Sequence, residues 1–217
     1  MIFWLTKGIQ TMLLKYYDNA APASFLLETL SDNLLDGKII IIPTDTVYSI
    51  CCDALNQQAI EDLAKLKGVD SKKTRFSILC SDLSQASEYA RISNEAFKLI
   101  KDNTPGPFTF ILPTISTLPK IYRGRKEVGI RIPRHELVQS LVRFYGRPLT
   151  GFSLPALSPE LDEAYGFDPS LIHELYQDLV SVVVDGGRGG ERVSAIVDCT
   201  AEPFEVVREG PEELMEA

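Results

Sequence analysis

Gly37-Lys-Ile-Ile-Ile-Ile-Pro-Thr-Asp-Thr-Val-Tyr48 is the stretch that decides the fold. Its four consecutive isoleucines predict a strand that is buried on both faces. Pro43 has no N–H to donate, so it ends the hydrogen-bonded ladder. Hydroxyl, carboxylate and phenol side chains follow at once, at the carboxyl end of the strand, where ligands bind in open α/β sheets. The stretch therefore predicts an α/β protein with a small polar ligand.

Segments with strand and helix patterns alternate outward from this stretch. Runs of β-branched and aromatic residues indicate strands, and apolar residues at helical spacing indicate helices. Gly37 and Gly68 each follow a helical segment, as glycines do at helix ends. The alternation predicts an α/β fold with a mixed sheet and flanking helices. The predicted strands span 13–17, 38–43, 76–80, 108–112, 128–132, 148–152, 180–185, 195–199 and 204–207, and the predicted helices span 23–35, 57–66, 84–90, 94–101, 135–144 and 171–179.

The bulk composition fits one globular domain. The chain has 217 residues, of which 45% are hydrophobic, and this is enough to bury a sizeable core. We expect a single domain over 13–210, an N-terminal extension over 1–12 and an acidic tail over 211–217. The formal net charge of −8 argues against the broad basic surface of nucleic-acid-binding domains.

The four cysteines carry no metal-binding or disulfide pattern. Cys51, Cys52, Cys80 and Cys199 contain no C-x-x-C pair, and the chain has only two histidines to join them. We expect reduced, buried thiols, no metal site on the protein and a cytoplasmic location. No run of about 18 apolar residues is present, so no membrane partner is expected.

The polar residues after the isoleucine strand are the first candidate site. The hydroxyls of Thr44 and Thr46, the Asp45 carboxylate and the Tyr48 phenol could hold an amino group, a hydroxyl or a phosphate. The alternative is that Thr44 or Asp45 only caps the next turn or helix.

A basic stretch is the second candidate site. Lys65, Lys67, Lys72, Lys73 and Arg75 surround a loop that precedes a predicted strand. Such a group suits the neutralisation of phosphates. The alternative is a solvated surface loop.

Arg131 is the third candidate because it lies inside the apolar strand predicted over 128–132. A buried charge is costly unless it is paired. Its counter-ion is therefore either a ligand anion or a carboxylate of the chain, and Asp45, Asp53 and Asp198 all remain open as partners.

Several motifs together resemble the YrdC/YciO family, which includes the threonylcarbamoyl-AMP synthases. The resemblance covers the chain from about 13 to 210, and the combination of motifs is specific although each alone is not. It implies an open, twisted sheet curled around a positively charged groove. The matching motifs are G-x-I-I-x-x-P-T-D-T-V-Y at 37–48, a lysine-rich loop around Lys67, P-G-P-F-T at 105–109, G-I-R-I-P at 129–133, a serine strand end at Ser153, D-G-G from Asp185, S-A-I-V-D at 194–198 and V-R-E-G at 207–210.

The resemblance also implies an activity and assigns roles to residues. The family's synthases combine threonine, bicarbonate and ATP into threonylcarbamoyl-AMP for tRNA modification, with Mg²⁺ expected to accompany ATP. Double-stranded RNA binding is also attributed to the family, so tRNA or double-stranded RNA is a possible partner. Threonine is expected at Thr44, Thr46, Tyr48, Arg131 and Ser194, and the nucleotide at Lys67, Lys73, Arg75, Ser153 and Arg208.

The chain departs from the synthase motifs at five positions. Val69 and Asp70 replace the arginine and proline of K-G-R-P, and Pro155 replaces the asparagine of S-A-N. Ser49 and Ala195 replace a glycine and a threonine. These departures resemble the YciO branch of the family. They leave two alternatives to a synthase: a protein that binds a nucleotide or RNA without making the adenylate, and a hydrolase of a nucleotide or a modified tRNA.

Overall fold

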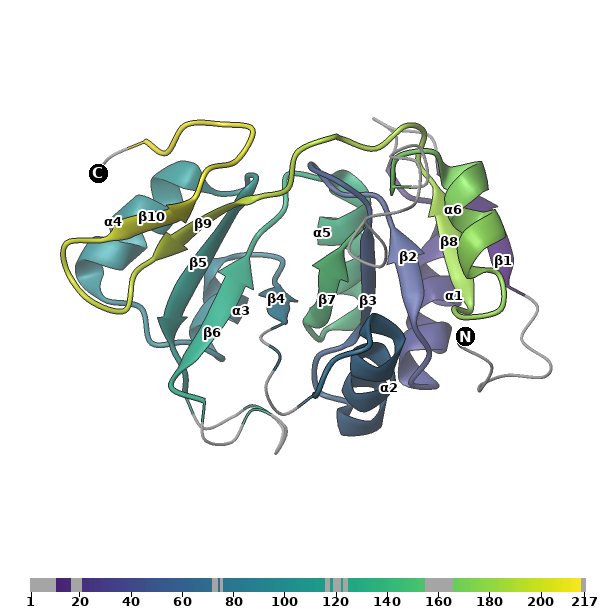
Figure 1. The fold of residues 1–217 in the computed structure, drawn as a ribbon, viewed down its shortest axis with the longest axis horizontal. Helices are drawn as coiled ribbons and strands as arrows, with labels where there is room; N and C mark the ends of the chain where they lie inside the picture. Colours follow the sequence, from purple (N-terminus) through teal and green to yellow (C-terminus); the bar gives the residue numbers. More distant parts are fainter. Residues whose placement is uncertain are drawn as a thin grey trace.

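The structure is a computed structural model that describes residues 11–16, 21–71, 74, 76–115, 118, 122, 125–154 and 166–215. In this part of the chain a single ten-stranded sheet runs through the molecule, with the strand order β1-β8-β2-β3-β7-β4-β6-β5-β9-β10. Figure 1 shows its strong twist, with β1 and β8 at one end and β9 and β10 at the other.

The sheet combines parallel and antiparallel pairs, which confirms the prediction of an open, mixed α/β sheet. Parallel pairs join β1 to β8, β2 to β8, β4 to β6 and β5 to β9, and the other neighbours are antiparallel. The strands are β1 (Met12–Lys15), β2 (Ile40–Ile42), β3 (Ser49–Asp53), β4 (Ser77–Leu79), β5 (Phe108–Pro113), β6 (Glu127–Arg131), β7 (Leu149–Ser153), β8 (Val182–Asp185), β9 (Ala195–Asp198) and β10 (Glu205–Arg208).

The helices begin and end at residues that stabilise helix termini. Asn56, Asp82, Ser93 and Asp168 each accept a hydrogen bond from a backbone N–H of the first turn that follows. Gly68 ends α2 in the left-handed conformation, at φ +73°. The helices are α1 (Ser24–Leu35), α2 (Gln57–Lys67), α3 (Leu83–Ser87), α4 (Asn94–Asn103), α5 (Glu136–Tyr145) and α6 (Pro169–Tyr176).

Strand β3 was not predicted from the sequence. Its residues, Ser49–Asp53, are all buried and pair antiparallel with both β2 and β7. The segment is short, and it begins with a serine and ends with an aspartate, so it lacks a strand pattern. Asp53 is tolerated because its carboxylate accepts hydrogen bonds from the Leu55 N–H, the Tyr145 hydroxyl and the Arg147 guanidinium.

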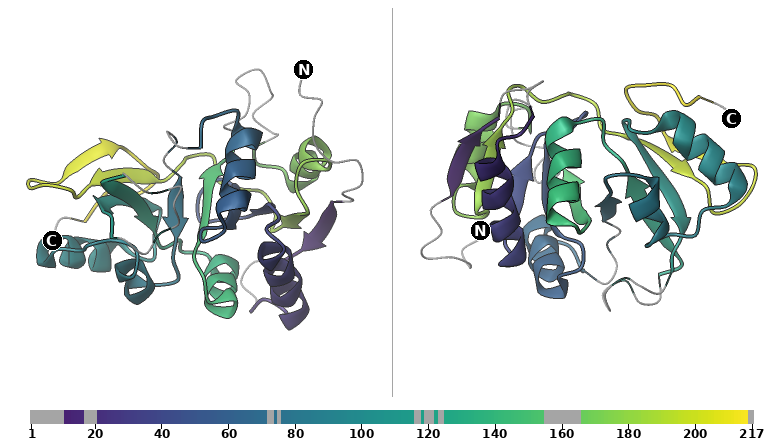
Figure 2. Two further views of the ribbon diagram at one scale, coloured as in Figure 1. Left: turned by 90° about the horizontal axis from the view of Figure 1, so that it is seen from below. Right: turned by 180° about the vertical axis from the view of Figure 1, so that it is seen from behind.

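Helices α1 and α5 lie side by side over part of one sheet face (Figure 2, right). They cover the face that carries Ile40, Cys51 and Leu149, and together these elements form an apolar core. The opposite face carries Ile41, Ile50 and Ile78, which belong to a second, larger core. Side chains of a strand alternate between the two faces, so β2, β3, β4, β7 and β8 contribute to both cores.

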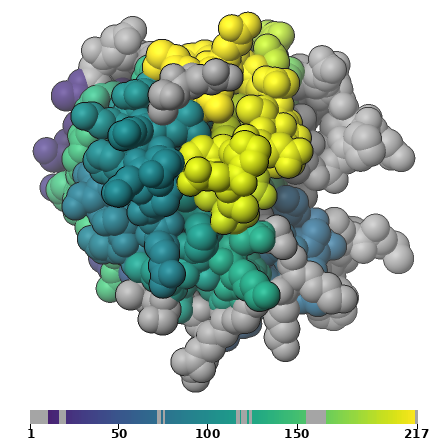
Figure 3. All heavy atoms as spheres, turned by 90° about the vertical axis from the view of Figure 1, so that its left-hand side faces the viewer, coloured from purple at the N-terminus to yellow at the C-terminus, as the bar shows by residue number. Residues whose placement is uncertain are grey.

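The two ends of the predicted domain differ in detail from the expectation. Met12, expected in the N-terminal extension, is the first residue of β1, while residues 1–10 lie outside the described part. Residues 211–215 of the acidic tail contact the body of the protein. The Asn103 side chain exchanges two hydrogen bonds of 2.8 Å with the Met215 backbone, and Arg134 forms an ion pair with Glu212. Figure 3 shows the C-terminal segment, in yellow, against the teal residues of α4.

Candidate functional site

A cavity of about 360 Å³ opens in the middle of the sheet, within the size range of small-molecule sites. Seven strands or their flanking residues and the end of α2 contribute to it. Three of the side chains are cationic, five carry hydroxyls, and none of these described lining residues is acidic. The lining residues are Ser49, Lys67, Ser77, Leu79, Thr109, Arg131, Gly151, Phe152, Ser153, Val193, Ser194, Ile196 and Arg208.

Strand pairing brings most of these residues to one sheet face. Arg131 pairs with Leu79, and Ser49 pairs with Ser153. Arg208 pairs with Ile196, which pairs with Thr109. Directly paired residues share a face, so segments far apart in the sequence present their polar groups to the same space. This face is continuous with the one that α1 and α5 cover farther along.

Arg131 is held by a polar cluster at the edge of the cavity. Its side chain is 5% exposed, and its Nη2 donates to Asp45 Oδ1 at 2.6 Å and to Thr46 Oγ1 at 2.8 Å. Asp45 is therefore the carboxylate partner among the three that the sequence left open. The Arg131 Nε is buried and has no hydrogen-bond partner among the described residues. The Nε–H of this guanidinium is therefore a donor that is still unused.

Thr44 and Asp45 build the turn between β2 and β3. The Thr44 hydroxyl donates to the Val47 carbonyl at 2.7 Å and accepts from the Thr46 N–H. Asp45 Oδ2 accepts from the Arg134 N–H at 2.9 Å. The alternative in which these residues cap a turn is therefore realised. Thr44 and Thr46 are not among the cavity-lining residues, although both contact Arg131.

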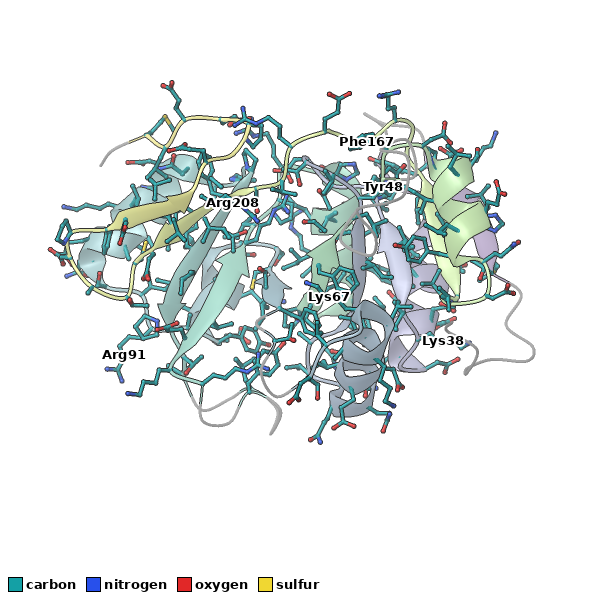
Figure 4. The ribbon with its side chains drawn as sticks, in the orientation of Figure 1. Lys38, Tyr48, Lys67, Arg91, Phe167 and Arg208 are labelled. Atoms are coloured by element: carbon teal, nitrogen blue, oxygen red, sulfur yellow. The ribbon has the colours of Figure 1, made fainter. Side chains whose placement is uncertain are left out.

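Tyr48 faces away from the cavity. Its ring is fully buried, and its hydroxyl donates to the Gly187 carbonyl and accepts from the Gly186 N–H. Burial raises the pKa of the Tyr48 phenol to about 12. Figure 4 shows Tyr48 near Phe167, apart from Lys67 and Arg208. The geometry gives Tyr48 a role in holding the Asp185–Gly190 loop, and its predicted contact with threonine stays a prediction.

Lys67 enters the cavity from the last turn of α2, and Arg208 enters it from β10 (Figure 4). Burial lowers the pKa of Lys67. The pKa of Arg208 is also lowered, first by burial and then by the positive charge of Arg131. Arg131 and Arg208 repel each other across the cavity, and an anion between them would relieve this repulsion.

Ser194 and Ser153 also lie where the site was expected. The Ser194 hydroxyl is 3.0 Å from the Thr109 hydroxyl, and its carbonyl accepts two hydrogen bonds from Arg208. Ser153 lies opposite Ser49 in the β3–β7 ladder. The structure thus brings Lys67, Arg131, Ser153, Ser194 and Arg208 together at one cavity.

Other expected residues lie elsewhere or outside the described part. Lys73 and Arg75 belong to residues that the structure does not describe, so their contact with the nucleotide stays a prediction. Lys65, from the same basic stretch, is exposed and pairs with Asp62 on α2. Its side chain matches the surface alternative.

Sequence reasoning missed three cavity hydroxyls, those of Ser49, Ser77 and Thr109. Their only sequence signal was position: each alternates with a buried apolar neighbour on a strand. Gly151, also in the lining, is required by close packing, because a Cβ there would lie 2.2 Å from the Ile50 carbonyl oxygen.

The described residues contain no group of three or more His, Cys, Asp or Glu side chains that could hold a metal ion. Magnesium usually binds proteins through substrate phosphates and a few carboxylates. The described helices also include none that is long and apolar enough to cross a membrane. The expected cytoplasmic location stays a prediction.

The Sua5/YciO/YrdC family model, whose description reads "Telomere recombination", matches residues 32–210. The chain belongs to this family. The match spans every cavity-lining residue, and it confirms the resemblance that the motifs indicated.

Relatives of known sequence or structure carry different names. The chain is 31% identical to the uncharacterized protein YciO of Escherichia coli K12, over 87% of this chain and 91% of that protein. The crystal structure of E. coli YciO matches with a TM-score of 0.85, over 95% of this chain and 98% of that chain. A putative threonylcarbamoyl-AMP synthase of Methanocaldococcus jannaschii is 29% identical, over 94% of this chain and 95% of that protein.

The fold is also that of the P. abyssi Sua5 crystallised with L-threonine. This match has a TM-score of 0.82 at 24% identity, and it covers 92% of this chain and 58% of the longer Sua5 chain. The proteins to which the chain is similar therefore include a threonylcarbamoyl-AMP synthase of Pyrococcus abyssi and a Sua5 structure that holds L-threonine.

Proposed function

We propose that this protein binds ATP and threonine in the cavity and acts as a threonylcarbamoyl-AMP synthase. The observation that carries the proposal is the meeting of Lys67, Arg131 and Arg208, from three distant parts of the chain, at one cavity with no carboxylate among its described lining residues. Separate cations at fixed positions suit a ligand with several negative charges. The family membership supports the same activity.

The reaction needs positioning and charge neutralisation more than a side-chain base. The threonine amine attacks bicarbonate, and a carbamate forms with loss of water. A carbamate oxygen then attacks the α-phosphorus of ATP, and pyrophosphate leaves. Lys67 and Arg208 would offset the negative charge of the phosphates, and Mg²⁺ bound to ATP would share this task.

Threonine is assigned to the Arg131 side of the cavity. The unpartnered Nε of Arg131 offers a donor for the threonine carboxylate, and the Thr46 and Ser194 hydroxyls lie within the same polar cluster or next to it. The Sua5 structure with L-threonine supports a threonine subsite in this fold. Arg131 stays paired with Asp45 in this arrangement, so a ligand would use only the donor that this pair leaves unused.

The synthase proposal is tested by products. The purified protein is incubated with ATP, radiolabelled bicarbonate and threonine, and the reaction is analysed for pyrophosphate and labelled adenylate. We expect both products to depend on threonine, and Arg208→Gln to lose most of the activity. Absence of a threonine-dependent product at high protein concentration would contradict a synthase.

A second candidate function is binding without synthesis. Val69, which stands where the synthase motif has an arginine, carries a side chain that is 37% exposed and offers no charge. A phosphate-aligning cation is thus replaced by an apolar group next to Lys67. Such a protein would hold a nucleotide, tRNA or double-stranded RNA, or would hydrolyse a nucleotide or modified tRNA.

The products separate these functions. Saturable ATP binding without threonine-dependent pyrophosphate supports a binding protein, and AMP or free threonine released with water as the attacker supports a hydrolase. Salt-sensitive binding of a structured RNA would add a nucleic-acid partner. A variant with Val69→Arg tests the replaced cation directly, because it should raise ATP affinity if phosphates pass this point.

A further inference from the structure

The Lys67 ammonium lies against two aromatic rings. Its Nζ is 4.7 Å from the ring centre of Phe152 and 5.6 Å from that of Phe76. Both distances are within the range of cation–π attraction. None of the described carboxylates forms a salt bridge with Lys67, so the two rings are the described groups that contact its charge.

Strand pairing places the two rings next to each other. Ser77 pairs with Gly151, so Phe76 and Phe152 come opposite each other at the end of the β4–β7 ladder. Their ring centres are 5.9 Å apart with an interplanar angle of 25°. Both side chains are buried, and this fixes the surface on which the lysine rests.

The end of α2 brings Lys67 to this surface. Gly68 stops the helix in the left-handed conformation directly after the lysine. The lysine stem is half-buried and its ammonium reaches the cavity that Phe152 also lines. A flexible lysine is thus confined by a helix end on one side and by two rings on the other.

We propose that Phe76 and Phe152 form an aromatic clamp that positions the Lys67 ammonium in the cavity, where it meets the phosphates of the nucleotide. The phosphate role of Lys67 rests on the proposed function, whereas the clamp itself does not. Apolar burial disfavours the charged amine, and the ring faces offset part of that cost. The clamp keeps the lysine both charged and fixed, as phosphate binding requires.

The test uses Phe152→Leu, which keeps an apolar side chain but removes a ring face. Phe110→Leu is the matched control, because Phe110 is buried in the same core and has no cation among its described ring contacts. The ¹³Cε shift of Lys67 is followed against pH by NMR, with the signal assigned through Lys67→Gln. We expect the pKa of Lys67 to fall by about 0.4–0.7 units in Phe152→Leu and to stay unchanged in Phe110→Leu.

ATP titration supplies the second readout. Loss of one ring should weaken ATP binding about two- to fivefold, and the control should bind as the wild type does. An unchanged Lys67 pKa in Phe152→Leu overturns the clamp. If the pKa of Lys67 falls in Phe152→Leu but the wild-type protein binds no ATP, the clamp is supported and the proposed nucleotide site is overturned. Phe76→Leu is measured in the same way, so that poor folding of one variant leaves the other decisive.

Discussion

Beneath α1 and α5, the sheet face that carries Ile40, Cys51 and Leu149 is apolar and closed. A short distance along the same strands, the face that carries Ser49 and Ser153 is polar and lines the cavity. The strands, the hydrogen-bond ladder and the alternation of side chains are the same in both regions. What differs is the cover, because α1 and α5 pack on the first region, whereas only the end of α2 reaches the second among the described helices.

The difference shows how one sheet supplies both stability and a binding site. Burial of apolar area beneath α1 and α5 stabilises the fold. The cavity region gives up such burial and presents hydroxyls and cations. Changes in the closed region should therefore act on stability, and changes in the cavity region should act mainly on ligand binding, except where a cavity residue is itself buried and paired.

Arg131 is that exception, and its loss gives the largest expected effect. Arg131→Met leaves Asp45 buried and without its cationic partner, which should reduce the free energy of unfolding by about 3–5 kcal/mol. Urea unfolding measures the change. The double variant with Asp45→Asn should recover much of the loss, because it removes the uncompensated charge. A single variant as stable as the wild type would show that the pair contributes nothing to the fold.

Leu141→Ala tests the closed region. Leu141 of α5 is fully buried in the apolar core beneath α1, so its truncation should reduce the free energy of unfolding by about 2–5 kcal/mol. Ligand affinity of the folded variant should not change. Leu35→Ala, at an exposed position of α1, is the matched control and should stay within about 0.5 kcal/mol of the wild type. Equal effects at the two leucines would remove the distinction between covered and open surface.

Tyr48 lies outside both regions, in the core on the opposite sheet face, and predicts a pH effect. Its pKa is raised to about 12 from the model-peptide value near 10, so the folded state holds its proton to higher pH than the unfolded state does. The corresponding stability is present below pH 10 and is lost as pH rises from 10 to 12. Tyr48→Phe should lose less stability than the wild type over this interval in urea unfolding. Parallel pH profiles of the two proteins would rule out this linkage.

Glu212→Gln tests the tail, which lies outside both regions. The Arg134–Glu212 pair is about half exposed at both side chains, so solvent screens it and its loss should cost less than about 1 kcal/mol. Thermal unfolding at low and at high salt measures the difference, which should shrink as salt is added. A larger, salt-independent loss would mean that Glu212 contributes through packing.

The sequence predicted the closed region better than the cavity. Isoleucines 39–42 indicated a buried strand because four consecutive β-branched residues fit little else. Strand β3 was missed because Ser49 and Asp53 broke its pattern, and two of the three bonds that satisfy Asp53 come from residues about 90 positions away. Long-range partners leave no local signal.

The same limit applies to the candidate site. Lys67, Arg131, Ser153, Ser194 and Arg208 were named through the family motifs, and the structure gathers them at the cavity. These residues come together because of the register in which the strands pair, and that register cannot be derived from the sequence. For the same reason the sequence could not choose Asp45 among three possible carboxylate partners, nor separate Tyr48 from the cavity.

The most direct test of the account is a calorimetric titration of ATP into the wild-type protein and into Arg208→Gln. Arg188→Gln removes the same charge from an exposed loop and serves as the control. We predict saturable binding to the wild type and to the control, and binding at least about tenfold weaker to Arg208→Gln, as expected for loss of a charged contact. No saturable binding to the wild type, or equal affinity in Arg208→Gln, would contradict an anion-binding cavity.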